Sequence, residues 1–285
     1  MRACVFLLAV FFLNLQAEAG DGSALRARHA ALLTKLADNP FGRPLHVESS
    51  HERGDHKGEI YAVVGRPFER VRSSLRRAGQ WCELLIVQAN VKDCEAASEN
   101  LSLFVARRAD DSPERAHRLD FSYDVPASST DYLEVALEAP EGPYDTTDYR
   151  IRLQAAPLDT GRTFLHLAYS YSLHGAARMG MRIYLASGGR DKVGFSVVGR
   201  TPEGQPVYVR GVRGVVERNT MRYYLALEAY LDALDAPAAE RIERRLRAFH
   251  AGLESYPRQL HELALGEYLD IKRADASRVL KSAIN

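Results

Sequence analysis

The chain has 285 residues, 46% of them apolar, and its 38 basic residues nearly balance 37 acidic ones. That apolar content is enough for one large globular core or two small ones. The balanced charge excludes a whole-molecule electrostatic field of the kind that draws proteins to nucleic acid, so no nucleic-acid partner is expected.

The first residues have the pattern of a secretory signal peptide. An apolar segment from Cys4 to Leu13 follows Arg2 and precedes Ala17-Glu18-Ala19, which offers a cleavage site after Ala19 between small residues. The segment is too short to cross about 30 Å of hydrocarbon. We predict that residues 1–19 are removed and that the mature chain is periplasmic or secreted; the alternative is an uncleaved anchor.

Cys82 and Cys94 are the two cysteines that remain after this cleavage. An isolated pair in an oxidising compartment favours a structural disulfide over a redox or metal site. Trp81 beside Cys82 is more typical of a packed position than of a reactive nucleophile. The alternative is two free, buried thiols.

Hydrophobic periodicity predicts a helix, a strand and a second helix near the start of the mature chain. Residues 23–37 have an amphipathic helical pattern, residues 59–64 read EIYAVV and predict a strand, and residues 67–77 predict the next helix. The apolar side of the first helix, which we expect to lie against the domain, consists of Leu25, Leu32, Leu33 and Leu36.

From Glu83 to Gly199 the period falls to two, which predicts a series of strands. Short connections between them favour an antiparallel, curved meander. The predicted strands are Glu83 to Val91, Leu101 to Arg107, Arg118 to Val125, Tyr132 to Ala139, Tyr149 to Ala155, Thr163 to Leu173, Arg178 to Leu185 and Lys192 to Val198.

After Gly211 the period becomes 3.6, which predicts a long helix to Leu234. Its apolar face consists of Val212, Val216, Asn219, Tyr223, Leu227, Tyr230 and Leu234. Glu217, Arg218 and Arg222 are expected on the solvent side. Further helices are predicted from Pro237 and from Pro257.

This order of elements resembles the START-like (SRPBCC, helix-grip) superfamily. The segments that carry the resemblance are GEIYAVV at 58–64, RPFERV at 66–71, WCELL at 81–85, NVKDC at 90–94 and ERNTMRYY at 217–224. The last three are similar to an uncharacterised exported bacterial branch. The resemblance implies an α+β fold in which a curved antiparallel sheet grips a long carboxy-terminal helix around an internal cavity. A β-sandwich or a lipocalin-like barrel is the alternative, and the helix directly after the first strand argues against both.

The resemblance spans about residues 45–235 and so divides the chain. We predict a signal peptide at 1–19, an N-terminal helical segment at 20–44, a START-like domain at 45–236 and a C-terminal helical extension at 237–285. The extension is predicted to be a helical hairpin added to the domain, and residues 237–271 are a possible site for a protein partner.

No motif for catalysis or for a cofactor is present. The sequence has no nucleophile elbow, no phosphate-binding glycine loop and no paired histidines of a zinc protease. His46, His51 and His56 are spaced by five, which puts neighbours on opposite faces of a strand, so no metal site is predicted. We expect no cofactor, and we favour a binding role over an enzymatic one.

The predicted strand at 163–173 has two unlike faces, of which the mixed one leaves room for a ligand. If the sheet grips the long helix, that face would lie opposite the helix and enclose a small-molecule pocket. The cavity candidates are Phe164, His166, Ala168, Ser170 and Ser172 on the strand and Asn219, Tyr223, Leu227 and Tyr230 on the helix. A filled core in which the tyrosines find partners for their hydroxyls is the alternative.

These features predict an exported protein that binds a lipid or other hydrophobic small molecule as a carrier or sensor. Two other classes stay open. One is an enzyme of cyclase or hydrolase type that uses His166 or a tyrosine in the same cavity. The other is a non-catalytic partner protein of the cell envelope that docks through its last helices.

Overall fold

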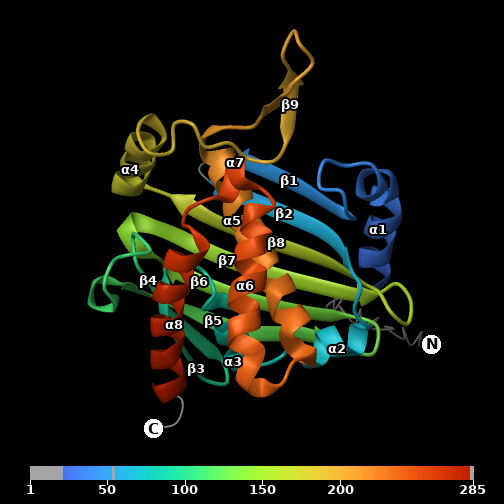
Figure 1. Ribbon diagram of the computed structural model, residues 1–285. Coiled ribbons are helices and arrows are strands. Elements are labelled where there is room, and N and C mark those ends of the chain that lie inside the picture. Colours follow the sequence, from blue (N-terminus) through green and yellow to red (C-terminus); the bar gives the residue numbers. More distant parts are fainter. Residues whose placement is uncertain (1–21, 53–54, 283–285) are drawn as a thin grey trace, which may run out of the picture.

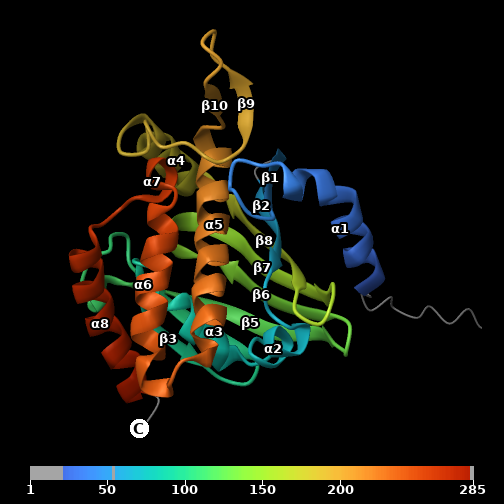
Figure 2. The ribbon, with the colours of Figure 1, turned by 45° about the vertical axis from the view of Figure 1, so that its right-hand side comes forward.

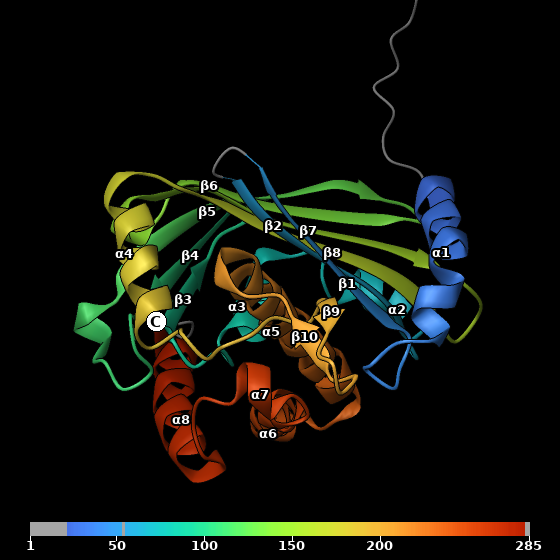
Figure 3. The same ribbon diagram turned by 90° about the horizontal axis from the view of Figure 1, so that it is seen from above.

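A curved antiparallel sheet wraps around one long helix, α5 (Gly211–Asp232), in the computed structural model (Figure 1). The structure describes residues 22–52 and 55–282, so the predicted signal peptide lies outside the described residues. Seen from above, the sheet, α5 and the C-terminal helices form three successive layers (Figure 3).

The sheet has eight strands in the order β1-β2-β8-β7-β6-β5-β4-β3. Strands β3 to β8 follow one another as a meander, and β2 closes the arrangement by pairing with β8, for example Ile60 with Leu167. The strands are β1 (Leu45–Glu52), β2 (Asp55–Val64), β3 (Val91–Ala96), β4 (Asn100–Val105), β5 (His117–Ser128), β6 (Leu133–Glu141), β7 (Thr146–Pro157) and β8 (Thr163–Leu173). The predicted α+β fold, in which a curved antiparallel sheet grips a long helix, is therefore confirmed.

Two predicted strands are not strands of the sheet. The segment predicted as a strand from Glu83 to Val91 begins with the last three residues of α3 (Ala78–Leu85), which follows α2 (Phe68–Ser73), and continues through turns at residues 86–90 to the start of β3. The backbone N–H of Arg77 donates to Gln80 at 3.0 Å at the start of α3, and Trp81, Leu84 and Leu85 are buried. An uninterrupted apolar run of this length fits a buried strand or a buried helix equally well, so the period did not separate them.

The second error concerns the segment after β8. Residues 178–185 lie in α4 (Gly175–Ala186) instead of a strand. Of the predicted strand at 192–198, the last two residues begin β9 (Val197–Arg200), which pairs with β10 (Pro206–Tyr208) in a projecting hairpin separate from the main sheet (Figure 2).

Helix α5 lies close against β2 and is enclosed on almost every side. A side chain at Gly58 would place its Cβ 2.2 Å from Thr220 Oγ1, so only glycine allows this approach. Glu217 and Arg218, predicted to face solvent, are 0% and 4% exposed. The Glu217 carboxylate accepts hydrogen bonds from the backbone N–H groups of Phe195 and Ser196 at 2.6 and 2.9 Å, because the loop after α4 folds over it.

The N-terminal helix α1 (Gly22–Ala37) packs on the outer, convex side of the sheet. Leu25, Leu32 and Leu36 are buried there with Phe164 of β8. Leu33, which was predicted to share this apolar side, is 53% exposed. It follows Leu32 directly and so projects in a different direction from the helix axis.

The helices after α5 pack on its far side. They are α6 (Arg241–Glu254), α7 (Pro257–Leu260) and α8 (Leu265–Ser282), so the single helix predicted from Pro257 is divided in two. Phe249 of α6 and Tyr268 of α8 belong to the same apolar core as α5 and the sheet. Short 3₁₀ segments occur at Pro113–Arg115, Pro143–Asp145, Ala233–Asp235 and Ala238–Glu240.

Cys82 and Cys94 form the predicted disulfide, with an Sγ–Sγ distance of 1.98 Å. The bridge joins α3 to β3, the edge strand of the sheet. Within the described ranges, no helix is both long and apolar enough to span a membrane.

Candidate functional site

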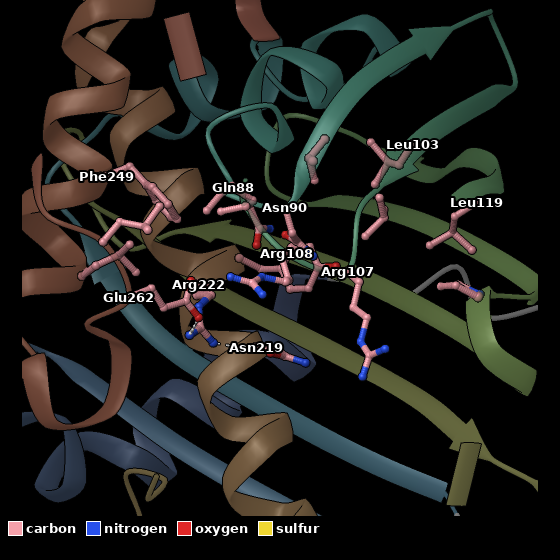
Figure 4. Close-up of a pocket in the computed structure, with 18 of the residues that line it drawn as sticks. Gln88, Asn90, Leu103, Arg107, Arg108, Leu119, Asn219, Arg222, Phe249 and Glu262 are labelled. Atoms are coloured by element: carbon pink, nitrogen blue, oxygen red, sulfur yellow. Dashed lines mark hydrogen bonds and ion pairs between the residues drawn. The ribbon is translucent and has the colours of Figure 1, made fainter. Parts of the chain in front are cut away.

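A pocket of about 540 Å³ lies between the concave face of the sheet, α5 and the C-terminal helices (Figure 4). Strands β3, β4, β5, β7 and β8 all contribute to it. Its lining consists of Gln88, Ala89, Asn90, Val91, Leu103, Val105, Arg107, Arg108, Ala109, Asp110, Leu119, Pro143, Tyr149, Tyr169, Asn219, Arg222, Tyr223, Phe249, Leu253, Glu262, Leu263 and Glu267.

Three tyrosines form part of the inner wall. The ring centroids of Tyr169 and Tyr223 are 4.9 Å apart, and those of Tyr149 and Tyr169 are 6.3 Å apart. Burial raises the pKa of each of the three phenols, so all are protonated at neutral pH. They present an aromatic surface to the cavity, and the Tyr149 hydroxyl donates to Thr146 Oγ1 at 2.8 Å.

Three arginines surround the more polar part of the pocket. The Nε of Arg108 donates to Asp110 at 3.0 Å, and Arg222 forms an ion pair with Glu262 that connects α5 to the segment before α8. Arg107 is exposed and forms no hydrogen bond or ion pair with the described residues. Figure 4 shows these guanidinium groups and Asn219 around one open space.

The lining of this pocket combines aromatic, aliphatic, amide and charged side chains. It includes carboxylates and tyrosines but no histidine, cysteine or serine. Across residues 22–52 and 55–282, no group of three or more His, Cys, Asp or Glu side chains could hold a metal ion.

The α5 half of the predicted site lies partly in this pocket. Asn219 and Tyr223 line it. Leu227 and Tyr230 are buried in the core away from the cavity. The Tyr230 hydroxyl donates to the carbonyl of Ser74 at 2.9 Å, as expected of a tyrosine in a filled core.

The β8 half of the predicted site is on the wrong face of the sheet. Leu165, Leu167 and Tyr169 face α5, whereas the alternate residues face outward. The residues displaced to the convex side are Phe164, His166, Ala168, Ser170 and Ser172. The large apolar side chains of β8 lie on the inner face because that face buries the most surface. The sequence-based prediction instead took the face with smaller side chains as the one with room for a ligand.

The displaced residues belong to a polar and aromatic cluster partly covered by α1. His166 Nε2 lies 2.9 Å from Glu59 Oε1 and its Nδ1 lies 2.8 Å from Gln154 Oε1. The Tyr61 ring stacks on the His166 ring, with centroids 4.4 Å apart. The Arg28 guanidinium carbon lies 4.7 Å from the centroid of the same Tyr61 ring.

Phe164 contacts His29 of α1, with ring centroids 4.8 Å apart. Ser172 donates to Asp55 at 2.6 Å, Ala168 is 8% exposed, and Ser170 is half-buried. His166 does not line the pocket and lies on the opposite face of the sheet, so it is not a candidate base for chemistry in that cavity.

Sequence reasoning missed the residues that reach the pocket from loops. Asn90, Arg107 and Arg108 flank β3 and β4, and Glu262 precedes α8. No local pattern distinguishes them from other surface residues. Only the meander and the return of the C-terminal helices bring them together around α5.

A second hollow, of about 450 Å³, lies between α5 and the end of β2. Its charged groups are paired with one another: Arg43 with Glu228 at 2.8 Å, and Arg66 with Asp232 at 3.2 Å. Since these ion pairs already satisfy the charges, the hollow is a poorer candidate site than the pocket beside the tyrosines.

No protein-family model and no curated protein matches the chain. Among solved structures, it is similar to a START superfamily protein from Mycobacterium smegmatis, with 15% identity and a TM-score of 0.31 over 46% of this chain and 88% of that one. It is similar to norcoclaurine synthase from Thalictrum flavum, with 10% identity and a TM-score of 0.32 over 50% of this chain and 76% of that one. A third similar structure is the Zhui aromatase/cyclase from Streptomyces sp. R1128, with 15% identity and a TM-score of 0.34 over 75% of this chain and 96% of that one. The assignment of a helix-grip fold rests on the strand order and the enclosed α5 described above.

Proposed function

We propose that the protein is exported and binds a lipid or other hydrophobic small molecule in the pocket between the sheet and α5, as a carrier or sensor. The observation that carries this proposal is the cavity of about 540 Å³, whose lining combines tyrosine, leucine and valine side chains with many polar and charged ones. Small-molecule sites typically have volumes of about 300–1,000 Å³. This pocket has the usual volume but more polar groups than most such sites.

The polar groups favour a ligand with one polar end. Arg107 has no partner among the described residues, whereas Arg108 and Arg222 are each paired with a carboxylate. A carboxylate or phosphate on the ligand would satisfy Arg107 with charge-assisted hydrogen bonds while the chain lies against the tyrosines.

Binding should be measured with cis-parinaric acid, a fluorescent fatty acid, and by its displacement. The wild-type chain should show saturable binding. Ala89→Trp should reduce it, because a large ring at this half-buried lining position fills the cavity. Ala30→Trp, at an exposed position of α1, is the matched control and should bind like the wild type.

The proposal fails if folded wild-type protein shows no saturable binding, or if both tryptophan variants bind as well as the wild type. Unfolding midpoints of the variants separate loss of the cavity from loss of the fold.

Export is a separate part of the proposal. It is supported by the signal-peptide pattern at residues 1–19 and by the bridged Cys82 and Cys94, since structural disulfides persist mainly in oxidising compartments. Cell fractionation followed by mass spectrometry should find a mature chain that begins at Gly20. A full-length chain in the cytoplasm would contradict export.

A further inference from the structure

The exposed apolar side chains of this protein are concentrated in one region. Among the described residues, eight large apolar side chains are exposed, and the six that lie between residues 175 and 210 are Met179, Ile183, Tyr184, Val197, Val198 and Val207. We call this region, α4 with the loop after it and the β9–β10 hairpin, the apolar–basic surface. Exposed apolar patches of this kind mark interaction sites.

Helix α4 has two apolar stripes that point in opposite directions. Ala177 and Met181 pack against the core. Met179 and Ile183, also four residues apart, point outward and are 56% and 62% exposed. The outer stripe makes no core contact and leaves an apolar surface available to an interaction partner.

The charge of the same region shows what kind of surface fits. Residues 175–210 contain six basic and two acidic residues, a net charge of +4, whereas the whole chain carries +1. Arg178 and Arg182 flank the exposed Met179 and Ile183 on α4, and the exposed Arg190 follows in the loop. The half-buried Lys192 instead donates to the carbonyl of His261 at 2.8 Å. Apolar side chains bordered by arginine and lysine are the pattern of helices that lie in the interface of an anionic membrane.

The loop after α4 leads to the hairpin, which projects from the molecule apart from α4 (Figure 3). The Arg210 guanidinium at the base of β10 donates to the carbonyl of Arg190 at 3.2 Å. The tip of the hairpin, residues 201–205, is polar and includes Glu203, so the sides of the strands and not the tip would contact the membrane.

We propose that the apolar–basic surface docks the protein on an anionic lipid bilayer, with α4 lying along the membrane interface. This inference does not depend on a ligand in the pocket. It has one consequence for the proposed ligand binding. Helix α4 packs against the 3₁₀ segment at Pro143–Asp145, and Pro143 lines the pocket. Docking through α4 would therefore bring the pocket close to the bilayer.

The test is flotation of the full chain with vesicles of phosphatidylcholine alone and of phosphatidylcholine mixed with phosphatidylglycerol. The wild type should bind the mixed vesicles and release them at high salt. The double variant Met179→Ser/Ile183→Ser should bind at least about ten-fold more weakly, because two large apolar side chains no longer enter the interface. Leu33→Ser/Leu265→Ser, a matched pair of exposed apolar positions on α1 and α8, should bind like the wild type.

A second pair of variants tests whether basic side chains of α4 contribute to vesicle binding. Arg182→Gln should weaken binding about five-fold at low salt, as expected for one basic residue near an anionic surface. Arg76→Gln, an exposed arginine after α2 that also forms no ion pair with the described residues, should have no effect.

The inference is overturned if the wild type does not bind anionic vesicles, if the α4 double variant binds them as well as the wild type, or if neutral vesicles bind equally. It is also overturned if the exposed stripe instead holds a second copy of the chain, seen as dimers without vesicles that the α4 double variant abolishes. Met179 and Ile183 are exposed, so both serine variants should keep the unfolding midpoint of the wild type.

Discussion

Glu59 is the residue whose ionisation most clearly links the outer cluster to stability. Burial alone would raise the pKa of its carboxyl, but hydrogen bonds from His166 and Lys57 outweigh burial and lower the pKa to about 2. A carboxyl with a lowered folded-state pKa stabilises the fold above its unfolded pKa and loses that contribution as the pH falls. The unfolding free energy should therefore decrease between about pH 4.5 and pH 2, by on the order of 3 kcal/mol from this group.

Chemical denaturation across this pH range tests the assignment. Glu59→Gln should lower the unfolding free energy at pH 7 and flatten its dependence on pH below about 4.5. Glu69→Gln, at a side chain that is 65% exposed, is the control and should change neither. If the two variants behave alike, the cluster around His166 does not contribute to stability in this way.

Arg107 is the residue whose charge should discriminate among ligands. The side chain is exposed, so its interaction with an anionic ligand is worth about 1 kcal/mol, or roughly five-fold in affinity. Arg107→Leu should weaken the binding of cis-parinaric acid by this factor and leave the binding of its methyl ester unchanged. Arg247→Leu on α6, away from the pocket, is the control. Equal losses for acid and ester would mean that Arg107 does not contact the polar end.

At the scale of elements, the Cys82–Cys94 bridge holds α3 against the edge strand β3. Removing it should cost about 3 kcal/mol by the loop-closure estimate, since it closes a short loop in the unfolded chain. The comparison is the denaturation midpoint of Cys82→Ala/Cys94→Ala with that of the wild type. Thiol labelling of unfolded, unreduced protein should find no free thiol in the mature wild-type chain, and two labelled cysteines per chain would refute the bridge.

The C-terminal helices are bound to the sheet by buried polar contacts as well as by apolar ones. The Tyr268 hydroxyl donates to the carbonyl of Val87 at 2.6 Å, and Lys272, 0% exposed, donates to the carbonyl of Val91. An added hairpin, as predicted from the sequence, would not need to share the core in this way. Deletion of everything after Asp235 should therefore expose one side of α5 and abolish cooperative unfolding.

Far-UV circular dichroism during thermal denaturation of the truncated chain is the measurement. A cooperative transition at reduced temperature would confirm the boundary near residue 236 that the sequence predicts. A broad transition would make helices α6 to α8 part of one folding unit with the sheet.

For the whole molecule, element order was more predictable than orientation. The run of strands and the long helix after Gly211 were predictable because their periods of two and 3.6 persist over many residues. The placement of α3 and α4 was not, because apolar residues in short segments fit either period. Which side of β8 faces α5 is determined by the register and packing of the whole sheet. Because the prediction chose the other side, five of its candidate residues lie on the convex face.

In the candidate site, too, some residues were predictable from the sequence and others were not. Asn219 and Tyr223 were predictable from the helical period, which places them on one face of α5. Arg107, Arg108 and Glu262 were not, because residues far apart in sequence meet at the pocket only after the meander is complete.

The central claim is that the pocket beside Tyr149, Tyr169 and Tyr223 holds a hydrophobic small molecule. Native mass spectrometry of the mature protein purified from its own cell envelope tests this most directly, with Ala89→Trp prepared in parallel. The account predicts a bound species on the wild type that denaturation releases as a lipid or similar molecule and that the tryptophan variant lacks. A wild-type protein that carries no bound species and takes up none from added envelope lipids would contradict it.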